Sequence, residues 1–178
     1  MEDDLRIELE RMRTADQATR QEAMEIVRAH GIDSPEYDAL RVRGRAQDAK
    51  HQARLVQIVE KHGWPGKSLV GDVASGGAFL ILQHGDLSTQ EKYLPLVRDA
   101  AATGEVSLSQ LALLEDRVLM VRGEPQLYGT QIARGRDGKP SLWPIAEGTP
   151  LAERRARMGL EPLAEYLKRF GMEPPRTA

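Results

Sequence analysis

The sequence predicts a mainly α-helical protein: a compact helical domain of about six to seven helices with a small C-terminal β-hairpin. Three observations predict it. Apolar residues recur at helical spacing over long stretches, helix start and stop signals punctuate the chain, and the pattern changes to strand-like alternation after Gly123. The 178 residues fit one domain, which we place at 1–172, and the proline-containing residues 173–178 are expected to form a flexible tail.

The first expected helix covers residues 2–29 and is amphipathic. Its apolar positions, such as Leu5 and Leu9, step by four and three along the chain and therefore share one face. Asp16 lies within this apolar stripe. Arg20 follows one helical turn later, at the spacing that allows it to pair with Asp16.

Six further helices follow from capping residues, prolines and closing glycines. Their expected bounds are 35–61, 69–84, 89–102, 108–122, 149–159 and 161–171. Ser34, Ser88 and Ser107 are the expected N-caps of three of them. The third helix of the chain is rich in glycine and alanine, which indicates close packing against a neighbour or a ligand.

A β-hairpin is expected near residues 125–146. Residues 126–132 predict one strand, Arg136, Asp137, Gly138 and Lys139 a turn, and residues 141–145 the returning strand. Because an isolated hairpin is marginally stable, we expect it to pack on the helices.

Composition excludes several function classes. The net charge of −2 and the pI of about 6.1 leave no basic excess for a nucleic-acid partner. The absence of cysteine excludes disulfides, thiolate catalysis and zinc–thiolate sites. No apolar run approaches the length of a membrane span, and the acidic start lacks the pattern of a signal peptide. We therefore expect a cytoplasmic protein without a membrane partner; the sequence indicates no oligomeric state.

No standard catalytic or cofactor-binding motif is present, and we expect neither a cofactor nor a metal. What stands out is a set of polar residues at positions where helical or hairpin patterning expects apolar ones. They are Asp16, Arg20, Asp48, His51, His84, Asp86, Asp116, Arg117, Gln126, Tyr128, Thr130 and Gln131. We assign catalytic roles to His84, Asp86 and Asp116. We assign substrate binding to Asp16, Arg20, Arg117, Tyr128 and Gln131.

His84 stands at the end of a predicted helix, two residues before Asp86. A histidine near a carboxylate can act as a general base with an orienting partner. The same two residues can share a metal with another carboxylate. The simpler alternative is a histidine that satisfies the free carbonyls at the helix end.

The other assigned residues also have structural alternatives. Asp116 and Arg117 point about 100° apart on a helix, so Arg117 can bind a carboxylate or phosphate while Asp116 faces elsewhere. Their alternative is a buried ion pair, for instance with the first helix. Tyr128 and Gln131 can contact a substrate or can belong to an ordinary hairpin. Trp64, in the helix stop after residue 62, either fills the core or forms the wall of a pocket.

Four motifs carry a resemblance to a known family. They are HGWPGKSLVG at 62–71, QHGD at 83–86, LEDRV at 114–118 and GEPQLYGTQ at 123–131. With them, and with Asp16, Arg20 and Asp48, the chain resembles the bacterial domain of unknown function 6624 family over most of its length. Gly85 stands where that pattern has alanine, and Phe79 where it has tryptophan. The resemblance implies a shared fold and a shared site, and it supplies no reaction.

Our functional hypothesis is an enzyme, a hydrolase or group transferase, that acts on a small polar or anionic molecule. His84 would be the general base or acid, oriented by Asp86 or Asp116, and Arg117 or Arg20 would hold an anion. One alternative is a non-catalytic module that binds a small molecule or a protein. The other is that the polar residues are buried ion pairs that fix helix register.

Overall fold

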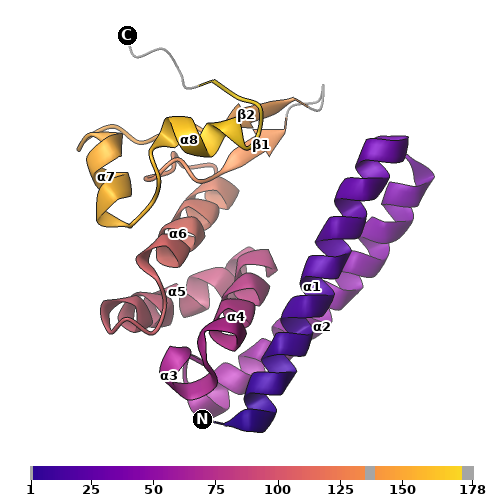
Figure 1. Cartoon of the computed structure of the whole chain (residues 1–178), viewed down its shortest axis with the longest axis vertical. Coiled ribbons are helices and arrows are strands. Elements are labelled where there is room, and N and C mark those ends of the chain that lie inside the picture. Colours follow the sequence, from indigo (N-terminus) through magenta and orange to yellow (C-terminus); the bar gives the residue numbers. More distant parts are fainter. Residues whose placement is uncertain (1, 135–138, 174–178) are drawn as a thin grey trace. The chain divides into compact units, whose positions relative to one another are not determined.

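The computed structural model describes residues 2–134 and 139–173. This part of the chain contains eight α-helices and one two-stranded antiparallel sheet (Figure 1). The predicted mainly α class with a small C-terminal hairpin is confirmed. The chain divides into two compact units, Met1–Val106 and Ser107–Ala178, and each is described by itself. The single domain over 1–172 stays a prediction. Most of the predicted turn, residues 136–138, and tail residues 174–178 lie outside the described residues.

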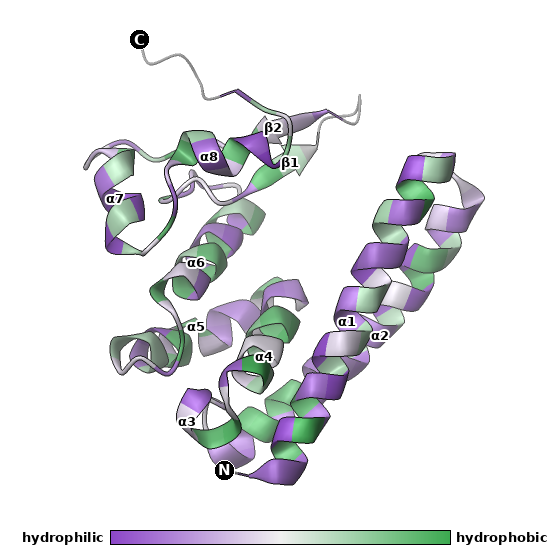
Figure 2. Ribbon diagram, viewed as in Figure 1, coloured by the Kyte–Doolittle hydropathy of each residue, from purple (hydrophilic) through white to green (hydrophobic). Residues whose placement is uncertain are grey.

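Unit 1 consists of helices only. They are α1 (Asp3–His30), α2 (Pro35–His62), α3 (Lys67–Val70), α4 (Asp72–His84) and α5 (Leu87–Ala102). The two long helices α1 and α2 lie side by side, and α4 packs against both (Figure 1). Hydrophilic and hydrophobic residues alternate along α1 (Figure 2), as expected for a helix that buries one face.

The helix boundaries of unit 1 follow local chemistry. Ser34 caps α2 as predicted, because its hydroxyl accepts a hydrogen bond from the backbone N–H of Tyr37 at 3.2 Å. The predicted helix 69–84 is divided into α3 and α4 by Gly71, which has φ of 83°. The predicted cap Ser88 is wrong: α5 begins earlier, at Leu87, and its N-cap is Asp86, whose carboxylate accepts the N–H of Thr89.

Small residues in α4 allow it to lie close against α1. A Cβ atom at Gly77 would stand only 2.8 Å from the carbonyl oxygen of Leu9. Leu9 is itself fully buried, and Trp64 is also in the core, as the simpler interpretation of its segment predicts. Close approach of α1 and α4 brings Asp16, in the middle of α1, to the C-terminal end of α4.

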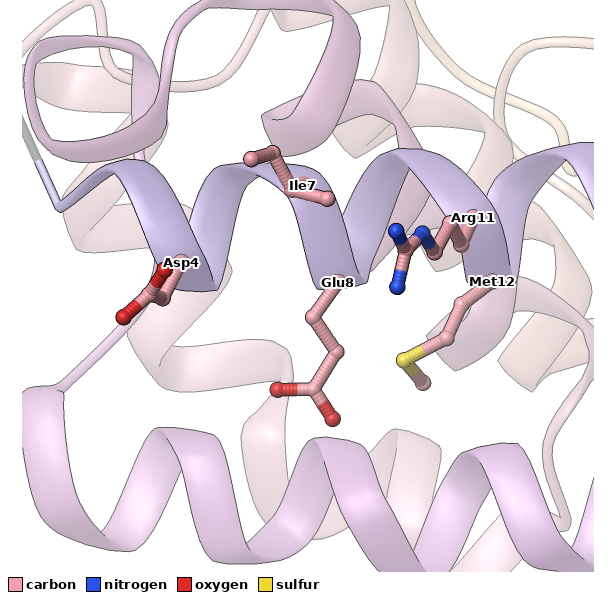
Figure 3. Close-up of a pocket in the computed structure, with 5 residues that line it drawn as sticks. All are labelled: Asp4, Ile7, Glu8, Arg11 and Met12. Atoms are coloured by element: carbon pink, nitrogen blue, oxygen red, sulfur yellow. The ribbon is translucent and has the colours of Figure 1, made fainter.

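A hollow of about 430 Å³ lies along the first part of α1 (Figure 3). It is lined by Asp4, Ile7, Glu8, Arg11 and Met12. The Glu8 carboxylate is bound by Arg54 of α2, with oxygen–nitrogen distances of 2.6 and 2.8 Å. One of the polar side chains that line this hollow, that of Glu8, therefore joins α1 to α2.

Unit 2 combines helices and the hairpin. Its elements are α6 (Leu108–Arg122), β1 (Ile132–Arg134), β2 (Pro140–Leu142), α7 (Leu151–Arg157) and α8 (Leu163–Lys168). Ser107 caps α6 in a reciprocal capping box with Gln110, which confirms the predicted start.

The hairpin is confirmed, but its strands are shorter than predicted. Ile132 pairs with Leu142 in the antiparallel ladder, and Gln126 forms an isolated parallel bridge with Ile145. The predicted strand 126–132 is wrong over most of its length. The backbone N–H groups of Leu127, Tyr128 and Thr130 are bound by the side chain of Asp116 and cannot serve a strand ladder.

Among the described residues, no helix combines the length and the apolar character needed to span a membrane.

Candidate functional site

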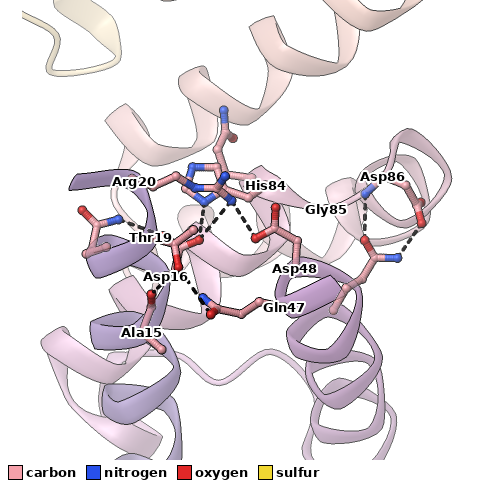
Figure 4. A network of polar contacts seen from close by, with 12 residues as sticks. Ala15, Asp16, Thr19, Arg20, Gln47, Asp48, His84, Gly85 and Asp86 are labelled. Carbon is pink, nitrogen blue, oxygen red and sulfur yellow. Dashed lines mark hydrogen bonds and ion pairs between the residues drawn. The ribbon is translucent and has the colours of Figure 1, made fainter. Parts of the chain in front are cut away.

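Unit 1 brings Asp16 of α1 and His84 of α4 into direct contact (Figure 4). Oδ1 of Asp16 lies 2.8 Å from Nδ1 of His84. The side chain of Asp16 is 2% exposed, whereas that of His84 is 23% exposed. The carboxylate is therefore held inside the unit, and the imidazole ring reaches its surface.

Arg20 joins this pair to a second carboxylate, that of Asp48 on α2. Its Nη2 atom lies 2.7 Å from Oδ1 of Asp48 and 3.3 Å from Oδ1 of Asp16. The predicted pairing of Asp16 with Arg20 is confirmed. Gln17 donates a hydrogen bond to the other oxygen of Asp16 at 2.9 Å, so both oxygens of this buried carboxylate are occupied.

The contacts fix the charges of these groups. Burial by itself would raise the pKa of Asp16, but the hydrogen bonds from His84 and Gln17 and the charges of His84 and Arg20 lower it overall. Burial likewise opposes the charge of Arg20, but Asp48 and Asp16 outweigh it and raise its pKa. Asp16 is therefore an ionised carboxylate and Arg20 a guanidinium at neutral pH.

An ionised carboxylate can only accept hydrogen bonds, so it determines where the proton sits on His84. The contact at Nδ1 requires that nitrogen to carry the proton. In the neutral ring, Nε2 then keeps a lone pair. A carboxylate that orients a histidine in this way also stabilises the imidazolium that forms when Nε2 takes up a proton.

His51 and Gln47 of α2 extend the site. Burial lowers the pKa of His51, and the nearby charges of Asp16 and Asp48 oppose this only in part. Within the described chain, Nδ1 of His51, Nε2 of Gln47 and Nε of Arg20 are buried without a hydrogen-bond partner. Such groups are costly unless a further hydrogen-bonding partner, such as water or a ligand, pairs with them.

Asp86 occupies a helix N-terminus beside this group. Its carboxylate accepts hydrogen bonds from the N–H of Thr89 and the hydroxyl of Ser88, both at 2.8 Å, and from Gln52. These donors, led by Gln52, lower its pKa to about 2. The structure thus places Asp16, and not Asp86, on the ring of His84. The catalytic role assigned to Asp86 stays a prediction.

In unit 2, Asp116 is fully buried and organises the loop after α6. It accepts the backbone N–H groups of Leu127, Tyr128 and Thr130 at 2.7, 3.0 and 3.0 Å, and the Thr130 hydroxyl at 2.9 Å. Burial raises the pKa of Asp116 although these hydrogen bonds oppose the rise. A buried acceptor with four donors holds the loop in one conformation.

The carbonyl groups of the same loop are held from α7 and α8. Nη1 of Arg155 donates to the carbonyl oxygen of Tyr128 at 2.6 Å, and the hydroxyl of Tyr166 donates to that of Thr130 at 2.7 Å. The sequence assigned no role to Arg155. The loop is therefore bound at both its N–H and its C=O groups.

The remaining assigned residues also belong to unit 2. The hydroxyl of Tyr128 donates to Glu115 at 3.0 Å. The side-chain amide of Gln131 donates to the carbonyl of Leu113 at 3.3 Å and to the Thr130 hydroxyl at 3.0 Å. Arg117 exerts an electrostatic influence on Tyr166 that lowers its pKa, against the larger effect of burial.

The structure thus brings Asp16, Arg20 and His84 together in unit 1, and it places Asp116, Arg117, Tyr128 and Gln131 in unit 2. Sequence reasoning listed Asp48 and His51 as misplaced polar residues without assigning them to the site, and it missed Gln17 and Gln47. The polar first half of the inner face of α2 was the available signal for Asp48 and His51.

In the described part of the chain, no group of three or more His, Asp or Glu side chains is arranged to hold a metal ion.

Comparisons with known proteins identify one similarity. A family model described as "Family of unknown function (DUF6624)" matches residues 3–172. No curated protein and no solved structure matches the chain.

Proposed function

Because the chain belongs to DUF6624, a family of unknown function, we propose a function from the site itself: a hydrolase or group transferase that acts on a small polar molecule. His84 is the general base and acid in this proposal, and Asp16 is its orienting partner. The observation that carries the proposal is the 2.8 Å contact between a buried, ionised carboxylate and a partly exposed imidazole.

The proposed chemistry follows from the open nitrogen of His84. Nε2 takes a proton from water or from a hydroxyl group as the oxygen attacks the substrate. The imidazolium, stabilised by Asp16, then returns that proton to the leaving group. No proton transfer to Asp16 is needed, because its low pKa keeps it ionised throughout.

The charges around His84 support a neutral polar substrate over an anionic one. Within unit 1, Asp16 and Asp48 contribute two negative charges and Arg20 one positive charge. Both carboxylates are bound through Nη2 of Arg20, and their negative charges would oppose an anion beside it. The buried amide nitrogen of Gln47, which has no hydrogen-bond partner within the described chain, suits a neutral carbonyl or hydroxyl oxygen better than an anion surrounded by carboxylates.

The proposal is tested by screening turnover of uncharged nitrophenyl esters, amides and glycosides with the full chain, alongside the anionic phosphate ester. His84→Gln and Asp16→Ala are compared with His30→Gln, whose side chain is exposed on α1. We expect turnover of an uncharged substrate that falls about 100-fold or more in both site variants and is retained in the control.

Two results would overturn the proposal. One is turnover that His84→Gln leaves unchanged. The other is a compound that raises the melting temperature in a His84-dependent manner and is never converted, which would identify a non-catalytic binding module instead.

A further inference from the structure

Arg155, in the short helix α7, is a buried cation. It is 1% exposed, and its side chain is among the largest fully buried ones in the described chain. Nε donates to the carbonyl of Glu161 at 2.7 Å, and Nη1 donates to the carbonyl of Tyr128 at 2.6 Å. The guanidinium carbon lies 5.3 Å from the centre of the Tyr166 ring. These partners carry partial charges, and only an anion can neutralise the guanidinium fully.

In the part of the chain that the structure describes, no carboxylate forms a direct ion pair with the Arg155 guanidinium, and Glu161 and Asp116 act on it only through space. The carboxylate of Glu161 lies 2.7 Å from Arg169, and that of Asp116 accepts the amides of the loop. Nη2 of Arg155 is buried and has no hydrogen-bond partner within the described chain. Burial accordingly lowers the pKa of Arg155, although Tyr166, Glu161 and Asp116 oppose the change.

Arg155 also forms part of the wall of a cavity of about 390 Å³ at α7 and the start of α8. The other residues of this wall are apolar: Leu151, Ala152, Ala156, Leu160, Pro162 and Leu163. Pockets of this size and character bind small molecules that are mostly apolar and carry one or two polar groups.

We propose that this cavity binds a small carboxylic acid with a short apolar tail. The carboxylate supplies the direct ion-pair partner that Arg155 lacks and accepts from its guanidinium, and the tail packs against the apolar wall. A guanidinium suits this role because its planar N–H groups match the two oxygens of a carboxylate. The site lies wholly in unit 2 and does not depend on the function proposed for His84.

The test is a titration of the full chain with four probes, followed by melting temperature and by the NMR signal of the Arg155 Nε–H group. Hexanoate carries both the anion and the tail, hexanamide the tail alone, acetate little more than the anion, and inorganic phosphate an anion of different shape. We expect hexanoate to bind at least about tenfold more tightly than each of the others, because the charge-assisted hydrogen bond and the buried tail both contribute.

Three variants separate the cavity from the folding role of Arg155. Arg155→Lys keeps the charge but loses the planar group, and it also weakens the loop that Arg155 supports. Ala156→Phe fills the cavity from an exposed helix position and leaves Arg155 in place. Ala49→Phe, at an exposed position of α2, is its control.

We expect Ala156→Phe to abolish the response to hexanoate and Ala49→Phe to retain it. The proposal is overturned if hexanoate gives no response up to about 10 mM, if hexanamide binds equally well, or if Ala156→Phe binds hexanoate as the wild type does.

Discussion

Nδ1 of His84 lies 2.8 Å from Oδ1 of Asp16, a residue 68 positions earlier in the chain. The carboxylate is buried and ionised, and it holds the ring so that Nε2 is the nitrogen left for a reaction. Arg20 balances Asp16 and joins it to Asp48 on α2. Three helices of unit 1 thus meet at one charged group.

The Arg20–Asp48 contact should contribute modestly to stability. The side chain of Arg20 is 37% exposed and that of Asp48 22%, so solvent screens their attraction. We expect a double-mutant cycle of Arg20→Ala and Asp48→Ala, measured by urea unfolding, to give a coupling of about 0.5–1 kcal/mol that decreases with added salt. A coupling of zero at low salt would show that the contact does not persist in solution.

Replacing Asp116 should have a much larger effect. Asp116→Ala leaves buried N–H groups of Leu127, Tyr128 and Thr130 without an acceptor. We expect a loss of about 3–5 kcal/mol in the free energy of unfolding and faster amide hydrogen exchange at those three residues. Unchanged exchange rates in the variant would contradict the role of Asp116 in holding the loop.

Asp86 should stabilise α5 as its N-cap. We expect Asp86→Ala to cost about 1 kcal/mol in urea unfolding at neutral pH, and Asp86→Asn to cost less because the amide oxygen can still cap. The pKa of Asp86 is lowered to about 2, below its value in the unfolded chain. Its contribution is therefore complete above pH about 4 and is lost as the pH falls towards 2. An equal difference between wild type and Asp86→Ala at pH 7 and at pH about 2 would refute this assignment.

His51 should make the protein less stable in mild acid. Burial lowers its pKa in the folded state, so the unfolded chain takes up a proton at a higher pH than the folded chain does. The contribution of neutral His51 to the free energy of unfolding is complete above pH about 6.5, the pKa of histidine in the unfolded chain. It decreases as the pH falls from that value towards the lower pKa of His51 in the folded protein. We expect His51→Gln to show a weaker fall in the free energy of unfolding between pH about 7 and 5 than the wild type. An identical pH dependence in wild type and variant would contradict a lowered pKa of His51 in the folded protein.

Much of the helical fold could be predicted because its signals are local. Ser34 and Ser107 cap helices where the sequence places them, and the i,i+4 spacing of Asp16 and Arg20 predicts their contact. Close packing around Gly77 follows from the run of small residues in α4. The sequence signal for each of these features lies within a few helical turns of the chain.

The contacts that define the candidate site are not local. Asp86 is close to His84 in sequence, and yet Asp16 is the residue on its ring, because the close approach of α4 to α1 decides the partner. Residues 126–132 alternate like a strand, but Asp116 of α6 binds three of their N–H groups. The spacing of apolar residues gives no sign of the role of Arg155, because that role depends on the contact between α7 and the loop that contains Tyr128.

The most direct test of the proposed site is the protonation pattern of the neutral His84 ring, read from its nitrogen chemical shifts in a long-range proton–nitrogen NMR spectrum. We expect wild-type His84 to carry its proton on Nδ1, bound to Asp16, and to change to the more common Nε2-protonated form in Asp16→Ala. A wild-type ring that is protonated on Nε2, or a ring that is indifferent to Asp16→Ala, would contradict the assignment of Asp16 and His84 as an oriented base.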